Sequence, residues 1–174
     1  HMLLGLACLA VLLPLADVVS YLSGRAIIPP FVAEMYRSAR DSGTLPLLAV
    51  ALIIAAPLAE ESVFRGFMYR GLATSRAGIV GAIVISSAVW AAMHVQYEPF
   101  FMLHIFAIGL LFGYWRWKSG STILTLILHA IVNAASLAQI GEFSFILADR
   151  SLQLGLLPEE GRDLILAGAI ISIL

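Results

Sequence analysis

Long apolar stretches alternate with short polar breaks along the chain, and this pattern predicts a bundle of helices. Crossing a bilayer takes an α-helix of about 20 residues. The stretches of suitable length are residues 3–22, 45–73, 78–97, 100–117 and 121–140. Residues 31–40 instead alternate apolar and charged positions at helical spacing, which is typical of an amphipathic helix at the membrane surface. Residues 164–174 are apolar but too short to span alone.

Composition supports the same architecture. Hydrophobic residues make up 61% and charged residues 12% of the chain, whereas soluble domains average about 45 to 50% and about 25%. We therefore expect an all-α integral membrane protein of about six helices that crosses the bilayer several times as one domain over residues 3–174. In a bacterium its place would be the inner or plasma membrane. The net charge of −1 speaks against a nucleic-acid surface, which needs clustered Lys and Arg.

Charged side chains interrupt the second apolar stretch at Glu60, Glu61 and Arg65. An unpaired charge at the bilayer centre costs about 2.5 to 3.5 kcal/mol on insertion scales, so such charges need partners. Glu61 and Arg65 are four residues apart, share one helix face and are predicted to pair. Glu60 lies about 100° further around the helix axis and is left over. Pro57, one turn earlier, is expected to bend or open the helix beside these charges.

A left-over carboxylate in an apolar environment suits proton transfer. Burial raises the pKa of a carboxylic acid in general, toward the range in which a general base works at neutral pH. Glu60 is therefore the first candidate for catalysis. The residues alone leave other readings open, because buried ion pairs also lock helices together and intramembrane charges also serve ion pathways and proton relays.

Two further apolar stretches carry polar residues at helical spacing. Trp90 and His94 are four residues apart, as are His129 and Asn133, so each pair is expected to share a helix face. A buried histidine taken singly is more commonly a hydrogen-bonded core residue than a catalytic one. Polar groups on three helices at one membrane depth are more informative, because they indicate a common site.

These residues resemble the motifs of a known family. Residues 60–65 look like its EExxxR motif, residues 90–94 stand at its FxxxH motif with Trp90 in place of Phe, and residues 129–133 match HxxxN. All three occur in order, within residues 45–140. The chain thus resembles the CAAX protease and bacteriocin-processing family of intramembrane proteases, also called type II CAAX prenyl endopeptidases or the ABI family. The change from Phe to Trp is expected to alter the shape of the pocket rather than its chemistry.

The resemblance implies a helical membrane protein with a buried polar cavity that hydrolyses a peptide bond near the bilayer. By resemblance, Glu60 with His94 would activate a water, and His129 with Asn133 would form the oxyanion hole. The expected substrate is a lipidated or membrane-anchored peptide or protein. The supporting positions that it implies are Glu61, Arg65 and Trp90.

The family is also described as metalloproteases, and the residues permit zinc. Glu60, His94 and His129 are a sufficient ligand set for a catalytic zinc with an open position, although the HExxH signature is absent. Cys8, the single cysteine, excludes a cluster of thiolate ligands. Asn133 is a poor zinc ligand and a good hydrogen-bond donor, which favours a glutamate mechanism with no metal cofactor and leaves zinc as the alternative.

Two other functions remain open at this stage. The first is a membrane scaffold or bacteriocin self-immunity protein that keeps the fold without turnover. The second is a small transporter or proton relay that uses Glu60, Glu61 and His129. A relay is expected to carry polar residues through the whole membrane thickness, whereas the motifs here cluster around one depth.

Overall fold

The structure, a computed structural model, describes residues 1–26 and 28–138 and isolated positions beyond them. Every regular element in these two ranges is a helix, which confirms the all-α prediction for this part of the chain. Contacts divide the chain into two compact units, His1–Val132 and Asn133–Leu174. The apolar stretch 164–174 and the end of the predicted span 121–140 lie outside the described residues. A single domain over residues 3–174 stays a prediction.

The helices follow the predicted apolar stretches closely. The first span is α1 (Met2–Leu22), and the predicted surface helix is α2 (Pro30–Asp41). The remaining helices after the second span are α6 (Gly78–Ala92), α7 (Pro99–Ser119) and α8 (Thr122–Ala138). The helices that are long and apolar enough to cross a membrane are Met2–Leu22, Leu45–Ala73 and Pro99–Ser119, and shorter apolar helices cover Gly78–Ala92 and Thr122–Leu137.

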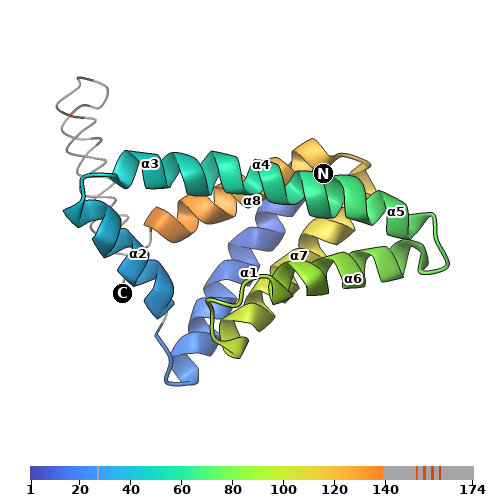
Figure 1. The fold of residues 1–174 in the computed structure, drawn as a ribbon, viewed down its shortest axis with the longest axis horizontal. Coiled ribbons are helices and arrows are strands. Elements are labelled where there is room, and N and C mark those ends of the chain that lie inside the picture. The colour runs from blue at the N-terminus through green and yellow to red at the C-terminus, as the bar shows by residue number, and fades with distance from the viewer. Residues whose placement is uncertain (27, 139–151, 153–154, 156–157, 159–160, 162–174) are drawn as a thin grey trace. The chain divides into compact units, whose positions relative to one another are not determined.

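The second span is one continuous helix (Figure 1), and two of its segments are wound as π-helix. Its successive parts are α3 (Leu45–Val50), η1 (Ala51–Ala55), α4 (Ala56–Glu61), η2 (Ser62–Met68) and α5 (Tyr69–Ala73), of which η1 and η2 are π-helical. Pro57 lies in the first turn of α4, directly after η1. Proline lacks the backbone donor of a regular turn, and π-helical turns are wider than α-helical ones and are frequent at functional sites. The predicted local opening beside the charges is therefore a change of winding and not a break.

The third predicted span is shorter than expected. Helix α6 ends at Ala92, so His94 lies in the connection to α7 and not on the helix. Glu98 has an extended backbone before Pro99, because a proline disfavours helical geometry in the residue that precedes it. The prediction of a helix over 78–97 was wrong at this end, where polar residues and the proline stop the apolar run.

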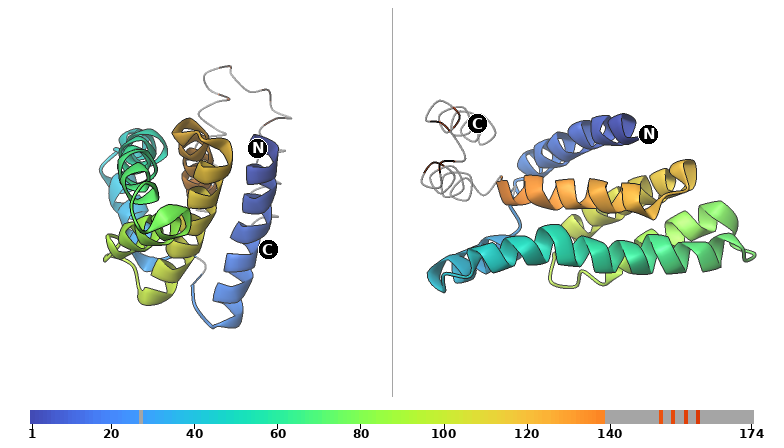
Figure 2. Two further views of the ribbon diagram at one scale, coloured as in Figure 1. Left: turned by 90° about the vertical axis from the view of Figure 1, so that its right-hand side faces the viewer. Right: turned by 90° about the horizontal axis from the view of Figure 1, so that it is seen from above.

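The core of the first unit is an apolar cluster to which α1, η2, α6, α7 and α8 all contribute. Its members are Leu9, Phe64, Trp90, Phe112, Trp115, Leu128 and Val132. Figure 2 shows the beginning of α8 between α1 and the long helix, where Leu128 faces Gly5 of α1 and His129 faces Glu61 of α4. Helix α6 contacts η2, α5 and α7. The three motif-bearing segments therefore meet around one core.

Glycines on α7 allow α6 to approach closely. A Cβ at Gly109 would lie 2.9 Å from the Cβ of Ser87, and a Cβ at Gly113 would lie 2.8 Å from Cγ2 of Ile83. These atoms lie close to the α6 backbone and cannot swing away as the end of a long side chain can. Small residues of this kind let membrane helices pack backbone to backbone.

We predict that Gly109→Ala destabilises the fold by about 1 to 3 kcal/mol, because the added methyl group overpacks the α6–α7 contact. Gly71→Ala is the matched control, since a Cβ there meets nothing within 4 Å. The control should be neutral or slightly stabilising, because alanine favours a helix more than glycine does. Thermal unfolding in detergent measures both effects, and equal unfolding temperatures for the two variants would contradict this packing.

Candidate active site

The polar centre of the first unit is an ion pair without access to solvent. Arg65 Nη1 donates to Glu61 Oε1 at 3.0 Å, and both side chains are 0% exposed. Arg65 Nη2 also donates to the carbonyl oxygen of Gly109 on α7 at 3.3 Å. The predicted pairing of Glu61 with Arg65 is thereby confirmed. The pair also connects the long helix to α7.

Aromatic rings complete the surroundings of the Arg65 guanidinium. Its Cζ lies 4.4 Å from the centre of the Trp90 ring and 5.4 Å from the centre of the Phe112 ring. A cation over an aromatic face is attracted by the ring quadrupole, most strongly over tryptophan. The buried charge is thus compensated by a carboxylate, a carbonyl and two rings, which come from three different helices.

His129 joins the two glutamates. Its Nδ1 lies 3.0 Å from Glu61 Oε1, the same oxygen that accepts from Arg65. A carboxylate oxygen accepts, so Nδ1 carries the proton and donates. The other ring nitrogen, Nε2, lies 3.9 Å from Glu60 Oε2. Glu61 therefore fixes the imidazole through one nitrogen and turns the other toward Glu60.

Trp90 connects Glu60 to both histidines. Its indole Nε1–H donates to Glu60 Oε2 at 2.5 Å, and its ring lies edge-on to the rings of His94 and His129, with centroids 5.3 Å away in each case. Phenylalanine has no N–H group and could not make the bond to Glu60. The expectation of a change in shape rather than in chemistry therefore left out the donor that tryptophan adds to the carboxylate.

His94 is held by the end of α6 rather than within it. Its Nδ1 lies 2.8 Å from the carbonyl oxygen of Trp90, which can only accept, so Nδ1 carries the proton. A ring that carries its proton on Nδ1 alone has an Nε2 that can accept a hydrogen bond. Glu60 and His94 thus meet through Trp90. The Glu60 side chain is 27% exposed, so it is not sealed inside the protein as Glu61 is.

Asn133 follows His129 by one turn of α8 and is half-buried. It is the first residue of the second unit, and its place in the oxyanion hole stays a prediction. In the part of the chain that the structure describes, no group of three or more His, Cys, Asp or Glu side chains is arranged to hold a metal ion. The zinc site of Glu60, His94 and His129 that the sequence permits stays an untested alternative.

Tyr97 also lies near these residues, although none of the three sequence motifs includes it. Its ring centroid lies 5.9 Å from that of His94. Burial raises the pKa of Tyr97, and the negative charge of Glu60 raises it further, so the hydroxyl stays protonated over a wide pH range. The available signal was its position, three residues after His94 in the same polar break.

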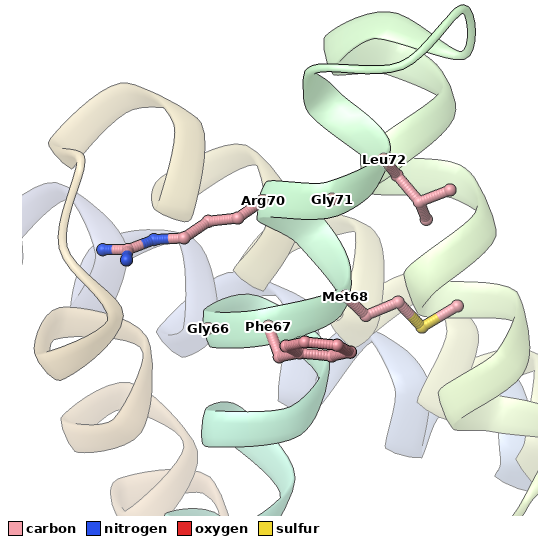
Figure 3. A pocket seen from close by; sticks show the side chains of 6 residues that line it. All are labelled: Gly66, Phe67, Met68, Arg70, Gly71 and Leu72. Carbon is pink, nitrogen blue, oxygen red and sulfur yellow. The ribbon is translucent and has the colours of Figure 1, made fainter.

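An open pocket lies elsewhere, along η2 and α5. Its lining is Gly66, Phe67, Met68, Arg70, Gly71 and Leu72, and it includes none of the predicted site residues. Arg70 extends to one side of the helix, while Met68 and Leu72 extend to the other (Figure 3). The pocket is therefore separate from the candidate active site at the glutamates.

The part of the chain that carries these residues also matches a known family. A sequence model of the family described as "Type II CAAX prenyl endopeptidase Rce1-like" matches residues 42–135, which is more than half of the chain. The chain belongs to this family. The matched range contains every candidate site residue and nearly coincides with the motif-bearing core predicted at residues 45–140.

Two proteins of Escherichia coli share sequence with this Rce1-like chain. An "Uncharacterized 24.3 kDa protein" is 30% identical over 115 residues, which cover 63% of this chain and 52% of that protein. The "Putative cation/proton antiporter YbaL" of strain K12 is 62% identical over 45 residues, which cover 26% of this chain and 8% of the antiporter. The chain thus spans about half or less of the length of these curated relatives. No solved structure matches it.

Removal of Arg65 should be severely destabilising. Arg65→Leu leaves the Glu61 carboxylate buried without its cation, which typically costs about 3 to 5 kcal/mol. The matched control is Arg25→Leu, because Arg25 pairs with Glu98 at 2.7 Å with side chains 44% and 55% exposed. Such an exposed pair is worth about 0 to 1 kcal/mol. Unfolding in detergent compares the two, and similar losses would mean that the buried pair stabilises the fold no more than the exposed one.

The bond from Trp90 to Glu60 predicts a spectroscopic change. Glu60→Gln replaces a charged acceptor by a neutral one, so the indole N–H proton of Trp90 should move upfield in a ¹⁵N-resolved NMR spectrum. The chain has 3 tryptophans, and the signal lost in Trp90→Phe identifies the resonance. Glu34→Gln, on the exposed side of α2, is the control and should leave the signal in place. An unmoved resonance in Glu60→Gln would argue against the bond.

Proposed function

We propose that the protein is an intramembrane endopeptidase that hydrolyses a peptide bond near the membrane surface in a lipidated or membrane-anchored protein or peptide. The proposal rests on membership of the CAAX endopeptidase family together with one observation. Glu60, His94 and His129 all contact the ring or the indole N–H of Trp90, although they come from α4, the α6–α7 connection and α8. An acid and two imidazoles gathered at one place suit acid–base catalysis.

In this proposal Glu60 is the general base. Its carboxylate takes one proton from a water, and the unprotonated Nε2 of His94 accepts a hydrogen bond from the same water and so orients it. The resulting hydroxide attacks the carbonyl carbon of the scissile peptide bond. When the tetrahedral intermediate collapses, the C–N bond breaks and the proton held by Glu60 passes to the leaving amine, which restores the carboxylate.

The oxyanion is assigned to His129 and Asn133. Because Nδ1 of His129 donates to Glu61, Nε2 can donate only when the ring is protonated. The carboxylates of Glu60 and Glu61 flank the ring and offset that positive charge. The side-chain amide of Asn133 would supply a second donor. One oxyanion donor in a dry site is typically worth about 2.7 to 4 kcal/mol.

We favour catalysis without a metal. Catalytic zinc usually needs three protein ligands and an open position. In both histidines Nδ1 donates to a protein oxygen, which leaves Nε2 available as a ligand, and this arrangement is also common in zinc-binding histidines. The Glu60 oxygen nearest to His129 already accepts from Trp90, however, and the geometry of the described residues provides no set of three ligands.

A proton relay is the second candidate, because the match to a putative cation/proton antiporter covers 45 residues of this chain. The contacts from Arg65 through Glu61 and His129 to Glu60 form a continuous polar chain within the first unit. A relay would acidify liposomes that contain the purified protein when a proton gradient is imposed. An endopeptidase would not.

Cleavage assays separate these functions. The probes are an internally quenched peptide with a farnesylated cysteine followed by three residues, and a quenched peptide with a membrane-anchoring apolar segment. Thermal unfolding first establishes that the Glu60→Gln and His129→Ala variants are folded. Each variant should then cleave either probe at a rate at least about 100-fold below that of the native protein, as expected for loss of a catalytic base or an oxyanion donor. Glu34→Gln is the exposed control and should cleave normally.

Equal turnover by the native protein and both site variants would remove these residues from the mechanism. Absence of cleavage in the native protein, with intact folding, would favour the scaffold or self-immunity function. Loss of cleavage on adding a zinc chelator, and its recovery with zinc alone, would replace the metal-free mechanism by a zinc one.

A further inference from the structure

His94 depends on contacts outside the regular helix for its orientation. It lies two residues beyond the end of α6, in a turn closed by backbone bonds from His94 N to Ala91 O and from Tyr97 N to His94 O, each 3.0 Å. On one side its ring meets Trp90, through the Nδ1 bond and an edge-on ring contact. On another side it meets the ring of Tyr97, inclined by 40° with centroids 5.9 Å apart.

Tyr97 is held in turn by the predicted surface helix. Phe31, the second residue of α2, lies edge-on to Tyr97 with ring centroids 5.6 Å apart and an interplanar angle of 70°. Aromatic pairs prefer this arrangement and gain from it beyond the area they bury. Phe31, Tyr97 and His94 therefore form a continuous row of ring contacts from α2 to the candidate active site.

A second contact joins the same two parts of the chain. Arg25 Nη1 donates to Glu98 Oε2 at 2.7 Å, and the Arg25 Cζ lies 4.7 Å from the centre of the Phe100 ring. An exposed ion pair contributes little by itself. It joins the connection before α2 to the connection that carries His94 and Tyr97, beside the contact of Phe31 with Tyr97.

We propose that Tyr97 is a positioning residue for the proposed endopeptidase: its ring holds the imidazole of His94, and Phe31 holds Tyr97, so that α2 sets the orientation of that histidine. The role of His94 in catalysis rests on the proposed function, whereas the two ring contacts are observed in the structure whatever the function is. Burial and the negative charge of Glu60 raise the pKa of Tyr97, so a neutral phenol ring, and not a phenolate, makes these contacts.

The kinetic test uses the farnesylated quenched peptide. Tyr97→Ala should lower kcat about tenfold or more with KM within about twofold, because it loosens His94 and leaves substrate binding intact. Tyr97→Phe keeps the ring and should retain nearly full kcat. Phe31→Ala should lower kcat by a smaller factor. The double variant Phe31→Ala with Tyr97→Ala should be no slower than Tyr97→Ala alone, since the two residues act in series.

A structural readout keeps the inference independent of turnover. In histidine-labelled protein, the imidazole signals absent from His94→Gln identify His94, and Phe31→Ala and Tyr97→Ala should both move them. Tyr21→Ala is the matched control, because Tyr21 of α1 is 73% exposed, and it should change neither kcat nor these signals. Unmoved His94 signals in Phe31→Ala, or kcat as low in Tyr97→Phe as in Tyr97→Ala, would overturn the proposal. Without any native cleavage the proposed function fails, while the imidazole signals still decide the positioning role.

Discussion

The ion pair of Glu61 with Arg65 is the contact on which the other polar groups depend. Both side chains are completely buried in a helix apolar enough to span a membrane. Neither charge could remain there alone, because an unpaired ion in an apolar interior is strongly unfavourable. Arg65 also binds the Gly109 carbonyl, and Glu61 also binds His129. One ion pair therefore connects the long helix to both α7 and α8, and holds the site together.

Local spacing allowed part of this arrangement to be predicted. Apolar length gave the approximate positions of the helices, and the four-residue interval gave the contact of Glu61 with Arg65, because both follow from the geometry of a single helix. The second partner of Glu61 could not be predicted in this way. The bond to His129 spans 68 residues of sequence and depends on how α8 packs against α4. Likewise, the contacts of Arg65 with the Trp90 ring on α6 and the Phe112 ring on α7 could not be predicted, because the FxxxH motif relates Trp90 only to His94 and Phe112 belongs to no motif.

Trp90 illustrates how a substitution within a motif can be misjudged from sequence. An aromatic residue in place of another predicts similar packing, and the Trp90 ring does pack, against Phe112 and both histidines. The additional feature is the indole N–H, whose effect depends on what lies opposite it. Here a glutamate oxygen lies opposite, so the proposed base is oriented by a donor that phenylalanine would lack. The departure from the family motif thus lies in the hydrogen bonding of Glu60.

The two histidines differ in their acceptors, and this difference argues for different roles. Each donates its Nδ1 proton, but His94 donates to a neutral backbone carbonyl and His129 to a carboxylate. A negative charge beside the ring offsets a positive imidazolium, whereas a carbonyl bonds equally well to a neutral ring. His129 is therefore better suited to donate from Nε2 to a developing oxyanion, and His94 to accept from a water. Because both acceptors belong to the protein, the protein itself fixes the orientation of each ring that the proposed mechanism requires.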